Sequence, residues 1–349
     1  MTKKNKTKPN ICILCFPNDN KNFGANLVCF SMQKIIEKMG YNASLLNFYK
    51  KTTQEEKKQG ASFIAFREKY ISLTNIVKTS LDFFLLNFKY NIFITGSDQV
   101  FNTNITKTYK KRYFLDFAHQ KNGKIAFSAS FGLEQFIGNK KLIKEIKKLL
   151  NRFNYISVRE TSAINIMEYT FKNNFNAQIT LDPSLLLDEK DYTNIINNDE
   201  KIITPTNKYI AAYIISNEYG IKNKETENLQ SKIENKFNLK TINIIKNEKG
   251  NYNSISQWLN YIKNAEFVIT DSFHGVCFSL IFKKNFAYLS QLGPTRVLNL
   301  LKLLNLEKLC YKSINDICLK TINYDTVEKK LSKLKKQSIE FLKTAIENC

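Results

Sequence analysis

The chain has 349 residues, of which 43% are hydrophobic and 13% aromatic, and its formal net charge is +22. This length favours two domains, and the hydrophobic content excludes a disordered chain or a fibrous repeat. Lysine supplies 48 of the 53 basic residues and is spread over the whole chain, whereas a base-reading interface favours clustered arginine. The charge therefore argues against a nucleic-acid partner, and it supports an anionic substrate or a lipid surface only weakly.

Hydrophobic runs and cysteine spacing bear on the compartment. No apolar run reaches the roughly 18 to 20 residues that a membrane span needs, and the lysine-rich stretch 1–10 lacks the following hydrophobic region of a signal peptide. Seven cysteines without a compact spacing pattern favour reduced thiols. Cys12 and Cys15 form a C-x-x-C, but an offset of three in a strand puts the two side chains on opposite faces, which indicates a core strand. We expect a cytoplasmic protein.

The first half of the chain alternates strands with helices. After a basic tail over 1–10, the apolar run Ile11–Phe16 predicts a strand, and Val28–Met39 keeps helical spacing after a turn-rich segment. The same alternation continues to residue 158. Further strands are predicted at Ala43–Phe48, Tyr90–Thr95, Lys124–Ser130 and Tyr155–Val158, with helices around Phe63–Tyr70 and Leu142–Phe153.

A second alternation follows a polar segment. Strands are predicted at Tyr209–Ile215, Thr241–Ile245, Ala265–Thr270 and Asn285–Leu289, with helices near Thr226–Lys236, Ser254–Asn264, Val276–Phe282 and Thr295–Leu304. We therefore place one domain at 11–188, a linker at 189–207, a second domain at 208–325 and, at 326–349, a helix that packs back on the body. The order predicts an α/β fold with two doubly wound, Rossmann-like domains facing a cleft, and ligands beyond the carboxyl ends of the strands.

Polar residues gather in the loop after the first predicted strand. Asn22, Gly24 and Asn26 open a helix whose N–H groups suit an anion or sugar hydroxyls. An Asx-turn with an ordinary N-cap would look the same. Both readings therefore stay open for this loop.

The run that follows the strand Tyr90–Thr95 is denser in hydrogen-bonding groups than a turn requires. Ser97, Gln99 and Asn102 are candidates for contacts with an acceptor, and Phe101 could stack on a sugar ring. Asp98 could orient or deprotonate a hydroxyl. A Ser or Asp N-cap on the next segment is the alternative.

Two arginines and one histidine are candidates for anion binding. Arg159 follows a predicted strand and Arg296 starts a predicted helix. An arginine guanidinium can bind a carboxylate or phosphate through two parallel hydrogen bonds. A salt bridge from Arg159 to a carboxylate such as Glu160 is the alternative. In the run Thr270–Gly275, a buried strand delivers Asp271, Ser272 and His274 to its carboxyl end, where Gly275 permits close backbone approach. That run indicates an anion site at a strand-to-helix junction.

In combination, these motifs give the chain a resemblance to the polysaccharide pyruvyl transferase family along nearly its whole length. Phe101 departs from the family pattern, which usually has Trp there. Five separated motifs in register carry the resemblance: Asn22–Leu27, Ile94–Asn102, Ser157–Glu160, Leu181–Leu187 and Thr270–Gly275.

The resemblance implies a fold similar to that of GT-B glycosyltransferases, with phosphoenolpyruvate as donor and a sugar with two neighbouring hydroxyls as acceptor. It associates Arg159 and His274 with donor binding and catalysis. Beside them, we assign Ser272, Gly275 and Arg296 to the donor, and Asp98 or Asp271 to the acceptor hydroxyls. The acceptor is expected on a cell-surface polysaccharide or its lipid-linked precursor, with contact to the inner membrane surface as an option. No cofactor or metal is expected, since no Cys/His cluster or carboxylate cage offers a metal site.

Two other functions stay open on the sequence alone. A glycosyltransferase with a nucleotide-sugar donor would share the architecture, because fold does not fix chemistry. A non-catalytic binder of an anionic polymer or membrane surface would suit the net charge.

Overall fold

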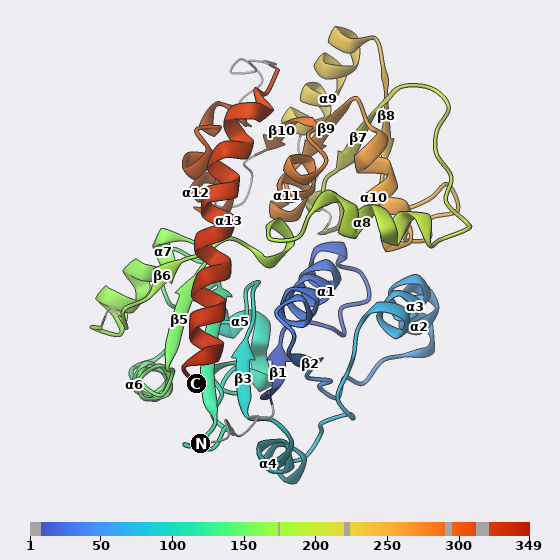
Figure 1. Ribbon diagram of the computed structural model, residues 1–349. Coiled ribbons are helices and arrows are strands. Elements are labelled where there is room, and N and C mark those ends of the chain that lie inside the picture. The colour runs from blue at the N-terminus through green and yellow to red at the C-terminus, as the bar shows by residue number, and fades with distance from the viewer. Residues whose placement is uncertain (1–7, 174, 220–223, 290–294, 312–320) are drawn as a thin grey trace, which may run out of the picture. The chain divides into compact units, whose positions relative to one another are not determined.

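The computed structural model describes residues 8–173, 175–219, 224–289, 295–311 and 321–349 (Figure 1). The chain divides into two compact units. Unit 1 comprises Met1–Thr53, Arg67–Leu186 and Leu334–Cys349, and unit 2 comprises Gln54–Phe66 and Leu187–Lys333. The main division thus falls next to the predicted limit at residue 188. The sequence did not indicate that 54–66 would group with unit 2, whereas 334–349 returns to unit 1 as the end of the helix predicted to pack back on the body.

The sheet of unit 1 is parallel and doubly wound. Among the described residues its strand order is β2-β1-β3-β4-β5-β6, so the chain turns to one side after β1 and to the other side from β3 onward. Because the strands are parallel and joined by crossovers, their carboxyl ends all lie at the same edge of the sheet. The strands are β1 (Asn10–Leu14), β2 (Asn42–Leu45), β3 (Ile92–Thr95), β4 (Gly123–Ala129), β5 (Tyr155–Val158) and β6 (Gln178–Ile179).

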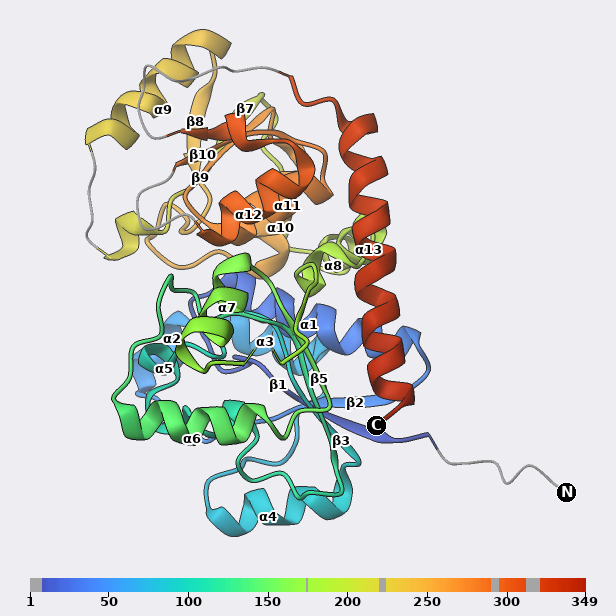
Figure 2. The same cartoon turned by 90° about the vertical axis from the view of Figure 1, so that its left-hand side faces the viewer.

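Helices cover both faces of this sheet. Consecutive residues of β5 show the two faces, because the Tyr155 ring contacts Phe341 of α13 (Tyr324–Glu347), whereas Ile156 joins the core cluster with Ile146 of α6 (Lys140–Leu150). Figure 2 shows α6 and α13 on opposite sides of the strands. The other helices of unit 1 are α1 (Phe23–Lys38), α4 (Ser80–Lys89), α5 (Thr103–Thr106) and α7 (Thr161–Asn165). The last turn of α3 (Ala61–Tyr70), from Arg67 onward, also belongs to unit 1, whereas the earlier part of that helix belongs to unit 2.

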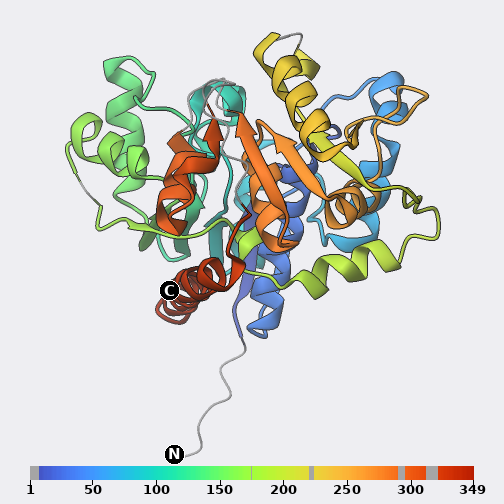
Figure 3. The ribbon, with the colours of Figure 1, turned by 90° about the horizontal axis from the view of Figure 1, so that it is seen from above.

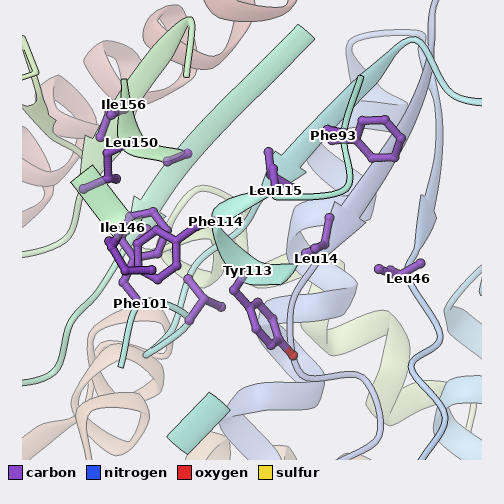
Figure 4. Packing of buried hydrophobic residues seen from close by; sticks show 14 of the residues in the cluster. Leu14, Leu46, Phe93, Phe101, Tyr113, Phe114, Leu115, Ile146, Leu150 and Ile156 are labelled. Carbon is purple, nitrogen blue, oxygen red and sulfur yellow. The ribbon is translucent and has the colours of Figure 1, made fainter. Parts of the chain in front are cut away.

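The core of unit 1 is rich in aromatic rings. Phe101 stacks on Phe114 with ring centroids 4.5 Å apart and an interplanar angle of 8°, and both lie near Ile146 and Leu150 of α6 (Figure 4). Phe101 is fully buried. Its ring faces belong to the core, so the prediction that Phe101 stacks on a sugar is wrong for this structure.

The sheet of unit 2 is also parallel. Among the described residues its order is β11-β10-β9-β7-β8, with the central β9 paired to β7 and β10. Seen from above, β9 and β10 run side by side in orange (Figure 3). Its strands are β7 (Tyr209–Tyr213), β8 (Lys240–Asn243), β9 (Phe267–Thr270), β10 (Asn285–Leu289) and β11 (Cys310–Tyr311). Its helices are α2 (Gln54–Gln59), α8 (Glu189–Asn197), α9 (Lys224–Phe237), α10 (Ile255–Asn264), α11 (Phe273–Ile281) and α12 (Thr295–Leu304).

The segment 189–207, expected to be a linker, begins with a packed helix. Tyr192 of α8 is fully buried and its ring lies 4.9 Å from Phe278 of α11. Trp258 of α10 contacts the same Phe278 ring at 5.2 Å. Burial of these rings holds α8, α10 and α11 together, so α8 is part of the core of unit 2.

The α/β fold with two doubly wound sheets is therefore confirmed. No helix within the described ranges is long and apolar enough to cross a bilayer.

Candidate active site

In unit 1, three of the sequence motifs meet at the carboxyl edge of the sheet. Arg159, directly after β5, places Nη2 2.6 Å from Asp182 Oδ2 and donates a hydrogen bond of 2.6 Å to Ser97 Oγ, just after β3. Nη1 lies 4.0 Å from Asp98 Oδ1. Ser184 donates its backbone N–H to Asp182 Oδ1. The salt bridge to a carboxylate that was considered for Arg159 therefore exists, with Asp182 as a partner.

Carboxylates dominate this edge. Glu160 is fully buried and accepts a hydrogen bond of 2.8 Å from the Ser130 hydroxyl, and Asp98 and Asp182 lie within ion-pair distance of Arg159. The side chains named here thus include three carboxyl groups and one guanidinium group. Such an edge suits hydroxyl donors better than a highly charged anion.

Asp98 has an unusual backbone. Its φ of 78° lies in the left-handed region that residues other than glycine rarely adopt. Its backbone carbonyl accepts the N–H of Ser130 at 3.0 Å. This strained turn places Asp98 beside the end of β4. Gln99 accepts from Asn102 Nδ2 at 3.1 Å, and Asn102 caps α5.

The loop after β1 is held from within. Asn22 caps α1 by accepting from Ala25 N at 3.0 Å, and Asn26 is buried and donates to Asp19 O at 2.7 Å. Arg67, buried in α3, donates to Asn20 Oδ1 at 2.7 Å. The N-cap alternative is thus confirmed for Asn22, and acceptor contacts of this loop, including the buried Gly24, stay a prediction.

In unit 2, the run Thr270–Gly275 joins β9 to α11. Asp271 accepts the backbone N–H groups of Ile215 at 2.7 Å and Ser216 at 2.9 Å, so each carboxylate oxygen fixes the chain that follows β7. Thr270 Oγ1 donates to Tyr213 O at 2.8 Å and accepts from Ser272 N at 3.0 Å. Because both oxygens of Asp271 hold backbone, we assign it to positioning and not to proton transfer.

His274 lies in the first turn of α11 and is 6% exposed. Ser272 is the N-cap, and among the described residues its side chain makes no capping hydrogen bond. Arg296 of α12 reaches the same place, with its guanidinium carbon 5.9 Å from the Phe273 ring centroid. The His274 ring lies 5.4 Å from the same Phe273 ring. The N-terminus of α11, the His274 imidazole and the Arg296 guanidinium therefore lie around Phe273 at one corner of unit 2, where a helix N-terminus and a guanidinium both favour an anion.

A Cβ on Gly275 would lie 2.1 Å from Thr270 Oγ1. Close approach of the helix to the strand end thus requires glycine here. Sequence reasoning assigned no role to Thr270, Asp182 or Arg67, although Thr270 and Asp182 stand in quoted motifs. Their roles follow from contacts between distant segments, which no local pattern reveals.

Across the part of the chain that the structure describes, no group of three or more His, Cys, Asp or Glu side chains converges as a metal site.

Two solved structures have a fold similar to that of this chain. A Listeria monocytogenes protein assigned as a UDP-N-acetylglucosamine 2-epimerase is 10% identical, with a TM-score of 0.53 over 95% of this chain and 91% of that one. The UDP-GlcNAc 2-epimerase of Methanocaldococcus jannaschii is 11% identical, with a TM-score of 0.52 over 93% of this chain and 92% of that one. At such identities the likeness shows the fold alone. The predicted GT-B-like fold is confirmed.

The sequence pattern of the polysaccharide pyruvyl transferases matches residues 22–292, most of the chain. This chain therefore belongs to the polysaccharide pyruvyl transferase family, which indicates a pyruvyl transferase enzyme. No protein of curated function matches the sequence.

Proposed function

We propose that this protein transfers a pyruvyl group from phosphoenolpyruvate to two neighbouring hydroxyls of one sugar, forming a ketal on a cell-surface polysaccharide or its lipid-linked precursor. The observation that carries the proposal is the corner of unit 2 where His274, Arg296 and the N-terminus of α11 gather. Family membership supplies the reaction class. The identities of the donor and of the acceptor are what this proposal adds to the reaction class.

The donor fits the chemistry of this corner. Phosphoenolpyruvate carries a carboxylate and a phosphate on one small molecule, and it needs cationic groups and N–H donors within a short distance. Arg296 offers a planar fork, and the first turn of α11 offers N–H groups with a positive dipole. Arg159 lies in unit 1 against Asp182 and Ser97, so its role at the donor stays a prediction that rests on the family resemblance and not on this corner.

The acceptor fits the carboxyl edge of unit 1. Sugar hydroxyls both donate and accept hydrogen bonds, and Asp98, Glu160 and Gln99 provide acceptor atoms at this edge. Asp98, whose own backbone forms the strained turn, is the carboxylate we assign to deprotonate or orient a hydroxyl.

The reaction balances without an oxidant or reductant. A proton adds to the methylene carbon of phosphoenolpyruvate, the first hydroxyl oxygen bonds to the central carbon, the carbon–oxygen bond to phosphate breaks and the second hydroxyl closes the ring. The two hydroxyls lose two protons, of which one ends on the new methyl group and the other on phosphate. His274 is the residue we assign to donate the first proton or to hold the leaving phosphate.

The first test is a phosphate-release assay on the purified chain with phosphoenolpyruvate and glycan acceptor. We expect release in step with the mass increment of one pyruvyl ketal on the glycan. We expect His274→Asn to lower the rate about 100-fold or more, in the range seen for loss of a general acid. His119→Asn is the matched control, because His119 is the other histidine and is exposed.

Ligand-induced thermal shifts distinguish the donor from its rival. A stabilisation by phosphoenolpyruvate that Arg296→Ala removes supports the proposed donor. Stabilisation by a nucleotide sugar alone, with no phosphate release from phosphoenolpyruvate, would show a glycosyltransferase instead.

A further inference from the structure

Helix α4 of unit 1 displays an apolar stripe to solvent. Leu81, Phe84, Leu85 and Phe88 are 63%, 51%, 53% and 70% exposed. Their spacing of three, four and seven puts them on one side of the helix. Together these residues are called the α4 stripe. Single exposed apolar residues are ordinary, but four large ones in one row mark an interaction surface.

The opposite side of α4 fixes the helix to unit 1. Phe83 and Leu86 are buried, and the Phe83 ring lies 5.0 Å from Phe117. Asn87 donates to Phe117 O at 3.1 Å and accepts from His119 N at 2.6 Å. The α4 stripe therefore cannot turn inward without breaking this packing. The α4 stripe thus stays exposed on a helix that is packed against unit 1.

Lysines flank the stripe. Lys78 precedes α4, Lys89 ends it and Lys121 places its ammonium 6.0 Å from the Phe88 ring centroid, and all three are exposed. The one acidic residue of the helix, Asp82, accepts the backbone N–H groups of Lys78 and Thr79 in a capping box. The surface around the stripe is thus apolar at its centre and cationic at its rim.

We propose that the α4 stripe docks on the surface of a bilayer that contains anionic lipids. Apolar side chains with flanking lysines are the composition of helices that lie in the membrane interface, where the apolar atoms enter the acyl boundary and the ammonium groups meet lipid phosphates. A second copy of this chain fits the surface less well, because two cationic rims on chains of net charge +22 repel each other.

The position of α4 in unit 1 is compatible with catalysis. The helix leads directly into the amino end of β3, whereas the candidate acceptor residues follow the carboxyl end of that strand (Figure 1). Docking through α4 leaves that edge uncovered. The inference does not depend on the proposed donor or acceptor.

Vesicle flotation of the full chain tests the proposal. We expect binding to vesicles of phosphatidylglycerol with phosphatidylcholine, and at least tenfold weaker binding to phosphatidylcholine alone. The double variant Phe84→Ser, Phe88→Ser should lose at least tenfold in binding to the anionic vesicles although its charge is unchanged. Tyr169→Ser and Ile203→Ser remove equally exposed apolar side chains elsewhere and should bind as the parent does.

Two outcomes would overturn the proposal. Unchanged binding of the double variant would mean that scattered lysines alone hold the chain on lipid. Light scattering that shows a dimer of the parent and a monomer of the variant, with equal lipid binding, would assign the stripe to self-association.

A second variant covers the case in which the double variant misfolds. Leu85→Trp places an indole in the α4 stripe, whereas the native Trp258 is fully buried. Its emission should shift to the blue on anionic vesicles, and Ile203→Trp should not shift. No shift for Leu85→Trp would also overturn the proposal.

Discussion

The contact between Arg159 and Asp182 decides how the edge of unit 1 is built. Both side chains are almost wholly buried, at 2% and 0% exposed. Each charge is expensive to bury alone, and the pair exists because the partners and Ser97 satisfy each other.

Arg159→Ala should therefore lower the free energy of unfolding by about 3–5 kcal/mol, since it leaves a buried carboxylate uncompensated. The double variant Arg159→Ala, Asp182→Ala should lose less than the two single variants added together. Urea denaturation measures all three. The exposed pair of Lys208 and Glu266, 3.0 Å apart, is the control, and Lys208→Ala should cost less than about 1 kcal/mol. Equal costs for Arg159→Ala and Lys208→Ala would contradict this account.

Gly275 controls the approach of α11 to β9. In Gly275→Ala the new methyl group would meet Thr270 Oγ1 at 2.1 Å and displace the hydroxyl that bonds Tyr213 O and Ser272 N. We expect a loss of about 1–3 kcal/mol in unfolding free energy, together with lower activity because His274 is the preceding residue. Thermal melts and phosphate release would show both.

Gly250→Ala serves as its control, because its φ of 76° carries strain but nothing lies within 4 Å of the added Cβ. It should destabilise the chain and leave the specific activity of the folded fraction intact. Full activity of Gly275→Ala would argue against the assigned contact.

At the scale of elements, sequence periodicity predicted the strands well and some helices poorly. Strands β5 and β10 were predicted to the residue, because buried parallel strands read as short apolar runs. Helix α4 was missed because its apolar residues lie on both faces, which hides the helical period. Strand β6 has only two residues and offers no pattern.

For the candidate site as well, one part was predicted from the sequence and another part was not. The placement of Arg159, His274 and Asp98 after strands followed from the topology rule for parallel sheets. Their partners did not, since the Asp182 contact and the burial of Phe101 depend on packing between segments far apart in the chain.

The end of α13 closes one face of the sheet of unit 1. Phe341 lies 6.2 Å from both Phe127 and Tyr155, and Leu181 N donates to Ser338 Oγ at 3.0 Å. Phe341→Ala should cost about 3 kcal/mol in unfolding free energy through lost burial and a cavity. Glu340→Ala, exposed one residue earlier, should cost less than about 0.5 kcal/mol. Similar melting temperatures for the two variants would show that this helix end does not stabilise unit 1.

At the scale of the whole molecule, this chain shares its fold with two solved 2-epimerase structures at about a tenth of identical residues. Such a fold is specified by where apolar runs and turns fall and not by particular side chains. The charge of the surface residues can therefore vary among proteins with this fold. Lysine is abundant in this chain, and among the described residues Lys124 is buried.

Lys124 is 2% exposed and donates to the carbonyls of His119 and Asn122, each at 2.7 Å. Burial lowers the pKa of Lys124 to about 8 from its usual 10.5, and repulsion from Arg152 adds to the shift. Between these two values the unfolded chain keeps the proton that the folded chain has released. The contribution of Lys124 to the free energy of unfolding should thus be constant below about pH 8 and rise with pH up to about 10.5.

Comparison with Lys124→Met isolates this contribution, because the tyrosines and cysteines that also titrate at high pH are common to both chains. A Cys349→Ser background removes a neighbouring thiol whose pKa burial raises to about 11. Urea denaturation from about pH 7 to pH 10 should show the parent gaining stability over Lys124→Met as the pH rises. A difference that stays constant over this range would mean that the three carbonyls around Nζ, those of His119, Gln120 and Asn122, hold the ammonium as well as water does.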